Sequence, residues 1–68
     1  MKIGIFDFCA DLVDGVVTLR VKDHANRIVA SGKGKKTSEA QQNAIETTQN
    51  GDARKHLQQV VLPDAPFD

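Results

Sequence analysis

The chain has 68 residues, 40% of them hydrophobic, and a formal net charge of zero from nine basic and nine acidic side chains. A chain this short buries only about 60% of the surface that its unfolded state exposes, which predicts one small domain and excludes a large multi-part active site. Zero net charge provides no whole-molecule field to attract a polyanion, so nucleic-acid binding would require a local basic surface.

A first strand is predicted from residue 2 to about residue 9, but its apolar side chains do not keep one parity. Ile3 and Ile5 are at odd positions, whereas Phe6 and Phe8 are at even positions. A half-buried strand keeps one parity, so either a bulge shifts the register or both faces are covered. Because large apolar patches are rarely left exposed, we predict a homodimer or a tight hetero-complex with Phe6 or Phe8 at the partner interface. The alternative is that both rings belong to the core of a closed monomer.

Two acidic residues, Asp7 and Asp11, interrupt any apolar run that a signal peptide or a membrane span would need. The expected location is the cytoplasm, with no membrane partner.

The next two strands are predicted as an antiparallel hairpin. Asp14-Gly15 marks a turn. The clearest alternation of the chain follows it, with apolar side chains at Val17, Leu19 and Val21. Residues 23–26 are polar and suit a short hairpin loop, after which residues 27–31 are predicted as the third strand.

A helix is predicted to follow the basic segment and to run to about Gln49. Thr37 or Ser38 can cap its N-terminus, and Ser38 with Gln41 has the spacing of a capping box. Gly51 is expected as a left-handed stop after this helix.

A second, shorter helix is predicted over residues 53–61, with Asp52 as its cap and apolar residues at spacings of four, three and one. Pro63 and Pro66 predict that residues 63–68 form an extended C-terminal tail. The expected fold is therefore α+β and two-layered: a three-stranded antiparallel sheet packed against one or two C-terminal helices, in a single domain over residues 1–62. Its core packs the alternating valines and leucine of the second strand against Ala40, Ala44 and Ile45.

The most informative segment for function is residues 32–44, which read Gly-Lys-Gly-Lys-Lys-Thr-Ser-Glu-Ala-Gln-Gln-Asn-Ala. Two glycines free the backbone, three lysines add charge, and the N-terminus of a helix offers unpaired N–H groups. This combination suits a phosphate group. The spacing of a P-loop is absent, and the alternative interpretation is a solvated strand-to-helix turn.

Residues 17–45 resemble the C-terminal two-thirds of a double-stranded RNA-binding domain. The matching positions are Gly32, Gly34, Glu39, Ala40 and Ala44. In that family, lysines at the start of the last helix grip phosphates across the RNA major groove. Here the family's Ser-Lys-Lys is Lys36, Thr37 and Ser38, and its later lysine is Gln41. The family's first helix and its Gly-Pro-x-His motif have no counterpart, so the resemblance implies the fold core more than the contacts.

Charge is concentrated in residues 20–36, where six cations against Asp23 give a net charge of +5. We therefore predict a small non-enzymatic module that binds duplex RNA or DNA through phosphates. The predicted contact residues are Lys33, Lys35 and Lys36, with help from Arg20 and Lys22. The alternative is a protein-interaction module, such as an inhibitor or adaptor of the kind that bacteria and their phages encode, acting through an apolar sheet surface.

Catalytic chemistry finds no support in the sequence. Cys9 is expected as an inert core thiol, and His24 and His56 as isolated surface imidazoles. One cysteine and two histidines cannot form a structural zinc site, and the early aspartates lack the spacing of a calcium loop. We expect no catalytic residues, no metal, no cofactor and no small-molecule substrate.

Overall fold

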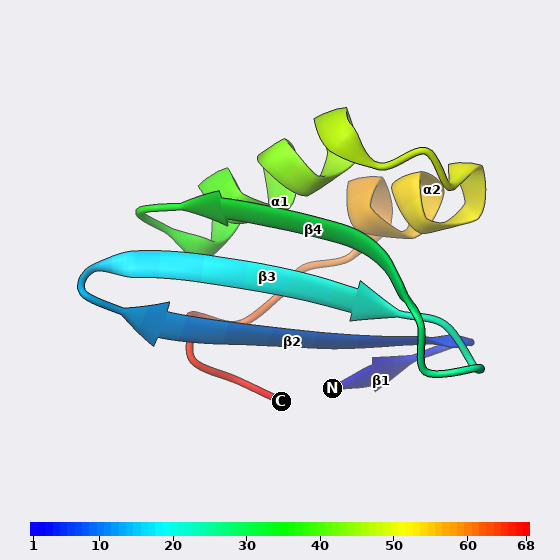
Figure 1. Cartoon of the computed structure of the whole chain (residues 1–68), viewed down its shortest axis with the longest axis horizontal. Helices are drawn as coiled ribbons and strands as arrows, with labels where there is room; N and C mark the ends of the chain where they lie inside the picture. The colour runs from blue at the N-terminus through cyan, green and yellow to red at the C-terminus, as the bar shows by residue number, and fades with distance from the viewer.

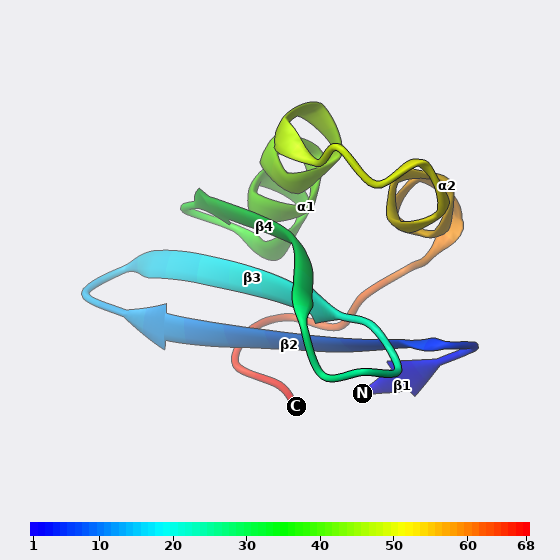
Figure 2. The same ribbon diagram turned by 45° about the vertical axis from the view of Figure 1, so that its right-hand side comes forward.

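A computed structural model describes residues 1–68 and shows four strands followed by two helices (Figure 1). The elements are β1 (Lys2–Ile3), β2 (Phe6–Val13), β3 (Val16–Lys22), β4 (Ile28–Gly34), α1 (Thr37–Thr47) and α2 (Gly51–Gln59). The strands form one antiparallel sheet in the order β1-β2-β3-β4. Both helices lie over the same face of this sheet (Figure 2). The predicted α+β fold is confirmed, with one strand more than expected, and neither helix is long and apolar enough to cross a membrane.

The extra strand explains the mixed parity at the N-terminus. Ile3 of β1 pairs with Phe6 of β2, and Gly4 and Ile5 form the turn between them. Gly4 has a φ of 62°, which is the left-handed conformation that such tight turns require and that glycine adopts without strain. The segment is thus a short hairpin, and neither the predicted bulge nor the doubly covered strand is present.

The β2–β3 hairpin and its core are as predicted. Asp14 and Gly15, with φ values of 53° and 75°, form the two-residue turn between Val13 and Val16. The side chains of β3 that face the helices are fully buried or nearly so. The buried apolar core comprises Phe6, Phe8, Ala10, Val17, Leu19, Val21, Ala30, Ala40, Ala44, Ala53 and Leu57. Ile45, expected in the core, packs against its margin.

Strand β4 extends to Gly34, three residues beyond the predicted end of the strand. Gly32 and Gly34 are partners of Leu19 and Val17 and face α1. A Cβ atom on Gly32 would lie 2.2 Å from the carbonyl oxygen of Ala40, and one on Gly34 would lie 2.9 Å from its backbone nitrogen. The two glycines therefore do not break the strand; they allow α1 to lie directly on its backbone.

The capping predictions for α1 are wrong. The helix begins at Thr37, and its N-cap residue, Lys36, makes no side-chain cap hydrogen bond. Gln41 does not reach back to Ser38; its Nε2 donates to the carbonyl oxygens of Leu57 (2.6 Å) and Val60 (3.0 Å). The amide thereby ties the end of α2 to α1.

The second helix is confirmed, but the stop predicted for the first helix and the cap predicted for the second are both wrong. Gly51 is the first residue of α2 and not the stop of α1. Its cap is Asn50, whose Oδ1 accepts a hydrogen bond from the N–H of Ala53 at 3.0 Å, and not Asp52.

Most positions on both edges of the sheet are covered. Three carbonyl oxygens along the outer edge of β4, those of Val29, Ser31 and Lys33, accept hydrogen bonds from side chains of the α1 region. The donors are Thr48, Thr47 and Asn43, respectively. On the other edge, β1 and the C-terminal tail lie beside β2. Such covering blocks edge-to-edge pairing with other chains at the covered positions.

The C-terminal tail (residues 63–68) is docked on the domain. Ala10 and Phe67 exchange two backbone hydrogen bonds of 2.8 and 3.0 Å. The N–H of Ala65 donates to the Oγ1 of Thr37 at 2.9 Å, and the Phe67 ring packs against the core. Thr37, predicted as a helix cap, thus holds the tail instead.

Candidate functional site: a basic corner and an apolar groove

The structure divides the five predicted phosphate-binding residues between two places. Strand register puts Arg20, Lys22 and Lys33 on the open face, which is the face of the sheet that the helices do not cover. Lys35 and Lys36 follow the end of β4 and lead into α1. A single continuous surface formed by all five residues is therefore not present.

Arg20 is neutralised by a neighbour on the open face. Its Nη1 lies 2.5 Å from the Oδ2 of Asp11. The hydrogen bond and the charge of Asp11 raise the pKa of Arg20 above its ordinary value. Arg27 likewise lies beside a carboxylate, 3.6 Å from that of Asp23. Neither arginine therefore presents an uncompensated charge to a phosphate.

The three lysines at the end of β4 and just before the start of α1 have no such partner. Lys33, Lys35 and Lys36 are exposed, and no carboxylate lies within 4.0 Å of any of their ammonium groups. We call these three residues the basic corner. Because the N-terminus of α1 has no side-chain cap, the positive end of the helix dipole adds to their charge.

The glycines position this corner, and they do not cradle a ligand. Neither Gly32 nor Gly34 has a positive φ. Their close contact with Ala40 and Ala44 fixes the end of β4 against α1. The interpretation of a flexible Gly-Lys-Gly phosphate loop is corrected: Lys33 lies at the end of a rigid strand, and Lys35 and Lys36 are the two residues between this strand and the helix.

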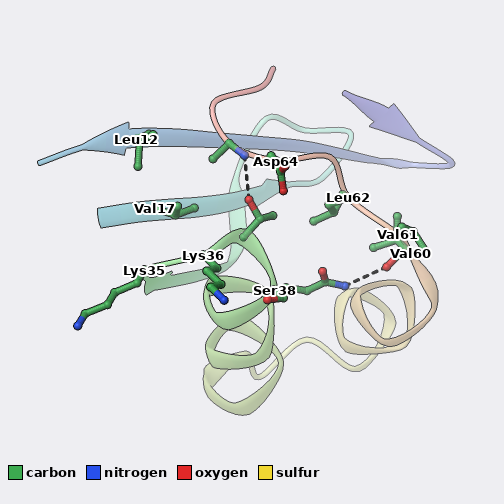
Figure 3. A pocket seen from close by; sticks show the side chains of 12 residues that line it. Leu12, Val17, Lys35, Lys36, Ser38, Val60, Val61, Leu62 and Asp64 are labelled. Atoms are coloured by element: carbon green, nitrogen blue, oxygen red, sulfur yellow. Dashed lines mark hydrogen bonds between the residues drawn. The ribbon is translucent and has the colours of Figure 1, made fainter. Parts of the chain in front are cut away.

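An apolar groove of about 510 Å³ lies beside the basic corner (Figure 3). Apolar residues of β2, β3 and the segment after α2 line it: Leu12, Val17, Val60, Val61 and Leu62. Lys35, Lys36 and Ser38 come from the α1 side, and Asp64 comes from the C-terminal segment. Leu12 is 47% exposed and Val61 is 92% exposed, so water reaches large apolar side chains here.

Sequence reasoning missed this groove because residues distant in the chain form it. Leu12 shares the parity of Phe6, Phe8 and Ala10, which is the one local signal that it faces the helices. No local pattern predicts that the segment after α2 returns to face it.

The partner interface predicted at Phe6 and Phe8 is wrong, because both rings are buried within the chain. Phe6 is 2% exposed and Phe8 is 0% exposed. The β1 hairpin puts both on the helix-covered face, where the Phe6 ring meets the His56 ring edge-on at a centroid distance of 4.8 Å. Sequence reasoning placed Ile3 and the phenylalanines on one strand and so required a partner for the second face.

The residues considered for chemistry do not gather. Cys9 is partly exposed on the open face, beside Arg20. Asp7 pairs with the N-terminal amine at 3.2 Å and Asp11 pairs with Arg20. No three His, Cys, Asp or Glu side chains lie close enough together to hold a metal ion.

Comparisons with protein-family models, with curated proteins and with solved structures give no match.

Proposed function

We propose that this chain is a small non-enzymatic module that binds the phosphate backbone of duplex nucleic acid through Lys33, Lys35 and Lys36. One observation supports this proposal above the others. The two arginines of the basic segment are neutralised by carboxylates, whereas the three lysines of the basic corner have none within 4.0 Å. Ammonium groups left free of carboxylates and close together in the chain are available to neutralise phosphates.

The local backbone strengthens the case for phosphate. Lysines that extend from a fixed strand end and a helix start lose less freedom on binding than lysines on a mobile loop would. The uncapped N–H groups at the start of α1 add donors of the kind that phosphate oxygens accept. We leave two residues out of this contact: Lys22 lies four residues along β3 from Thr18, the partner of Lys33, and Arg20 is occupied by Asp11.

Phosphate binding of this type does not distinguish the base sequence of the duplex. The chain has no Trp or Tyr, and two of its three Phe residues are buried, so no ring platform is available for base stacking. Phosphate contacts position a protein on a duplex without distinguishing base pairs. We therefore expect similar affinity for duplexes of unrelated sequence.

The test is the salt dependence of binding to a fluorescein-labelled RNA duplex, followed by fluorescence anisotropy. Three neutralised phosphates predict a slope of roughly −2.7 for log affinity against log salt, or about a 40-fold loss between about 50 and 200 mM. Replacing all three lysines of the corner by alanine should abolish this binding.

The matched control removes the same number of charges elsewhere, by replacing Lys2, Lys22 and Lys55 with alanine. This control should keep the slope, because those lysines lie outside the basic corner. If the two triple variants weaken binding equally, or if the wild-type protein shows no salt-sensitive binding at low ionic strength, the proposal fails.

A further inference from the structure

The edge of β2 that faces away from β3 is paired along most of its length. Phe8 exchanges hydrogen bonds of 2.7 and 2.6 Å with Met1, and Ala10 exchanges bonds of 2.8 and 3.0 Å with Phe67. These are alternate residues of one antiparallel strand, so the next residue whose backbone N–H and C=O point to this edge is Leu12. No backbone or side-chain group pairs with Leu12 on that edge. One strand position thus remains open for pairing.

This open position lies at the apolar groove. Leu12 forms one wall of the groove together with Val17, while Val60 and Val61 stand opposite, as Figure 3 shows. In strand addition, an extended peptide pairs with an exposed sheet edge: main-chain hydrogen bonds provide affinity, and pockets bind alternate side chains. This site has both requirements, an unpaired strand edge and apolar walls beside it.

The charge around the groove selects the kind of segment. Lys35 and Lys36 extend from the α1 side without carboxylate partners, and the N-terminus of α1 points to the same place. Asp64 is the one acidic side chain of the lining, and it leaves an excess of positive charge. A segment that combines apolar and acidic residues therefore complements the groove, and apolar walls without aromatic rings do not suit nucleic-acid bases.

The protein's own tail shows that this part of the fold accepts such a segment. Residues 62–68 read Leu-Pro-Asp-Ala-Pro-Phe-Asp, an extended stretch of apolar and acidic residues. It pairs with Ala10, the edge position before Leu12, and bonds to the first helical residue, Thr37. An extended acidic chain thus already pairs with β2 at the edge position next to Leu12, and its residues Leu62, Asp64 and Ala65 line the groove.

We propose that the groove binds an extended acidic segment of a partner protein, which pairs with the backbone of Leu12 and continues the β2 edge beyond the tail. Alternate side chains of this segment enter the groove between Val17 and Val60. The intervening side chains of the segment carry carboxylates, which form ion pairs with Lys35 and Lys36. This interaction shares Lys35 and Lys36 with the proposed phosphate contact, but Leu12 and Val60 contribute nothing to a phosphate contact and so distinguish the two.

The test is a titration of the ¹⁵N-labelled protein with an acetylated octapeptide of alternating valine and glutamate, monitored by amide chemical shifts. The matched probe alternates valine and lysine. The acidic peptide should shift the amides of Leu12, Lys36 and Val61, and the basic peptide should leave them in place. Loss of the two ion pairs in the K35A/K36A variant should weaken binding by about tenfold or more.

Two further variants separate the groove from apolar surface in general. Leu12→Thr should weaken binding of the acidic peptide, whereas Ile28→Thr, at a more exposed site on β4 (57%), should not. Leu12→Thr should also leave duplex binding unchanged, so failure of this proposal is distinguishable from failure of phosphate binding. Equal shifts with both peptides, or no shifts at millimolar peptide, would each overturn the proposal.

Discussion

Gly32→Ala should severely destabilise the protein, because α1 lies directly on the backbone at this position. The added Cβ atom would meet the carbonyl oxygen of Ala40 at 2.2 Å and the backbone nitrogen of Ala44 at 2.5 Å. Cβ atoms essentially never approach other atoms within 3.0 Å, so α1 would have to move away by about 0.8 Å. Backbone atoms cannot rotate aside as a flexible side chain can.

The cost follows from what this movement opens. Ala40 and Ala44 are completely buried and pack α1 against the sheet, and a gap of 0.5–1 Å forfeits roughly a quarter to a half of each dispersion contact. Overpacking of a well-packed core costs about 1–3 kcal/mol, and the rigid neighbours here put the expected value at the upper end, about 3 kcal/mol. A chain of this length has a free energy of unfolding of roughly 3–10 kcal/mol, so the change removes a third or more of it.

Thermal unfolding followed by far-UV circular dichroism measures this effect. About 3 kcal/mol corresponds to a fall in Tm of roughly 12–24 °C in a domain of this size. The matched control is Gly51→Ala at the start of α2, where an added Cβ meets no atom within 4 Å. Alanine there should maintain or raise the Tm, since it favours the helix by up to about 1 kcal/mol. If Gly32→Ala unfolds within about 2 °C of the wild type, the close packing of α1 on β4 is refuted.

Three other predictions concern the hydrogen bonds that hold the edges and loops. Thr48→Val should cost about 1–3 kcal/mol in urea unfolding, because it leaves the carbonyl of Val29 without its 2.8 Å donor, whereas Thr48→Ser should be milder. The backbone N–H of Arg27 lowers the pKa of Asp23 below its ordinary value of 3.8. The stability that this carboxylate contributes is therefore present above about pH 4 and lost as the pH falls through its folded-state pKa, so Asp23→Asn should flatten the decline in stability between about pH 5 and pH 2. Phe67→Ala should loosen the tail and accelerate hydrogen exchange of the Ala10 amide, which donates to the Phe67 carbonyl at 2.8 Å; an unchanged rate would contradict tail docking.

The parts of the fold that the sequence predicted are those with local causes. Asp14-Gly15 between two alternating segments specifies a two-residue hairpin, because both residues accept the left-handed conformation. The period of Val17, Leu19 and Val21 identifies the face that packs against the helices, whatever lies above it. The second helix was predicted for the same reason, from the spacing of its apolar side chains.

The errors concern groups whose partners are distant in the chain. Ser38 and Gln41 have the spacing of a capping box, but the end of α2 offers Gln41 two carbonyl oxygens, and those bonds replace the local one. Thr37 is similarly taken by the N–H of Ala65, 28 residues away. Polar side chains that can bond locally thus serve contacts between elements when packing brings unpaired backbone groups to them.

The glycines show how one local pattern supports two different physical meanings. Gly-Lys-Gly-Lys-Lys before a helix is typical of a phosphate loop when the glycines give the backbone freedom. Here Gly32 and Gly34 are required for another reason: a Cβ atom at either position would clash with α1. The lysines are therefore not on a mobile loop but at the junction of β4 and α1. Lys33 lies on the open face, and Lys35 and Lys36 border the groove. A duplex and an acidic peptide segment would each need the charges of Lys35 and Lys36, and a lysine that neutralises a phosphate is not free for a carboxylate. The two proposed ligands therefore compete for the same corner, and the residues that distinguish them are Lys33 on one side and Leu12 on the other.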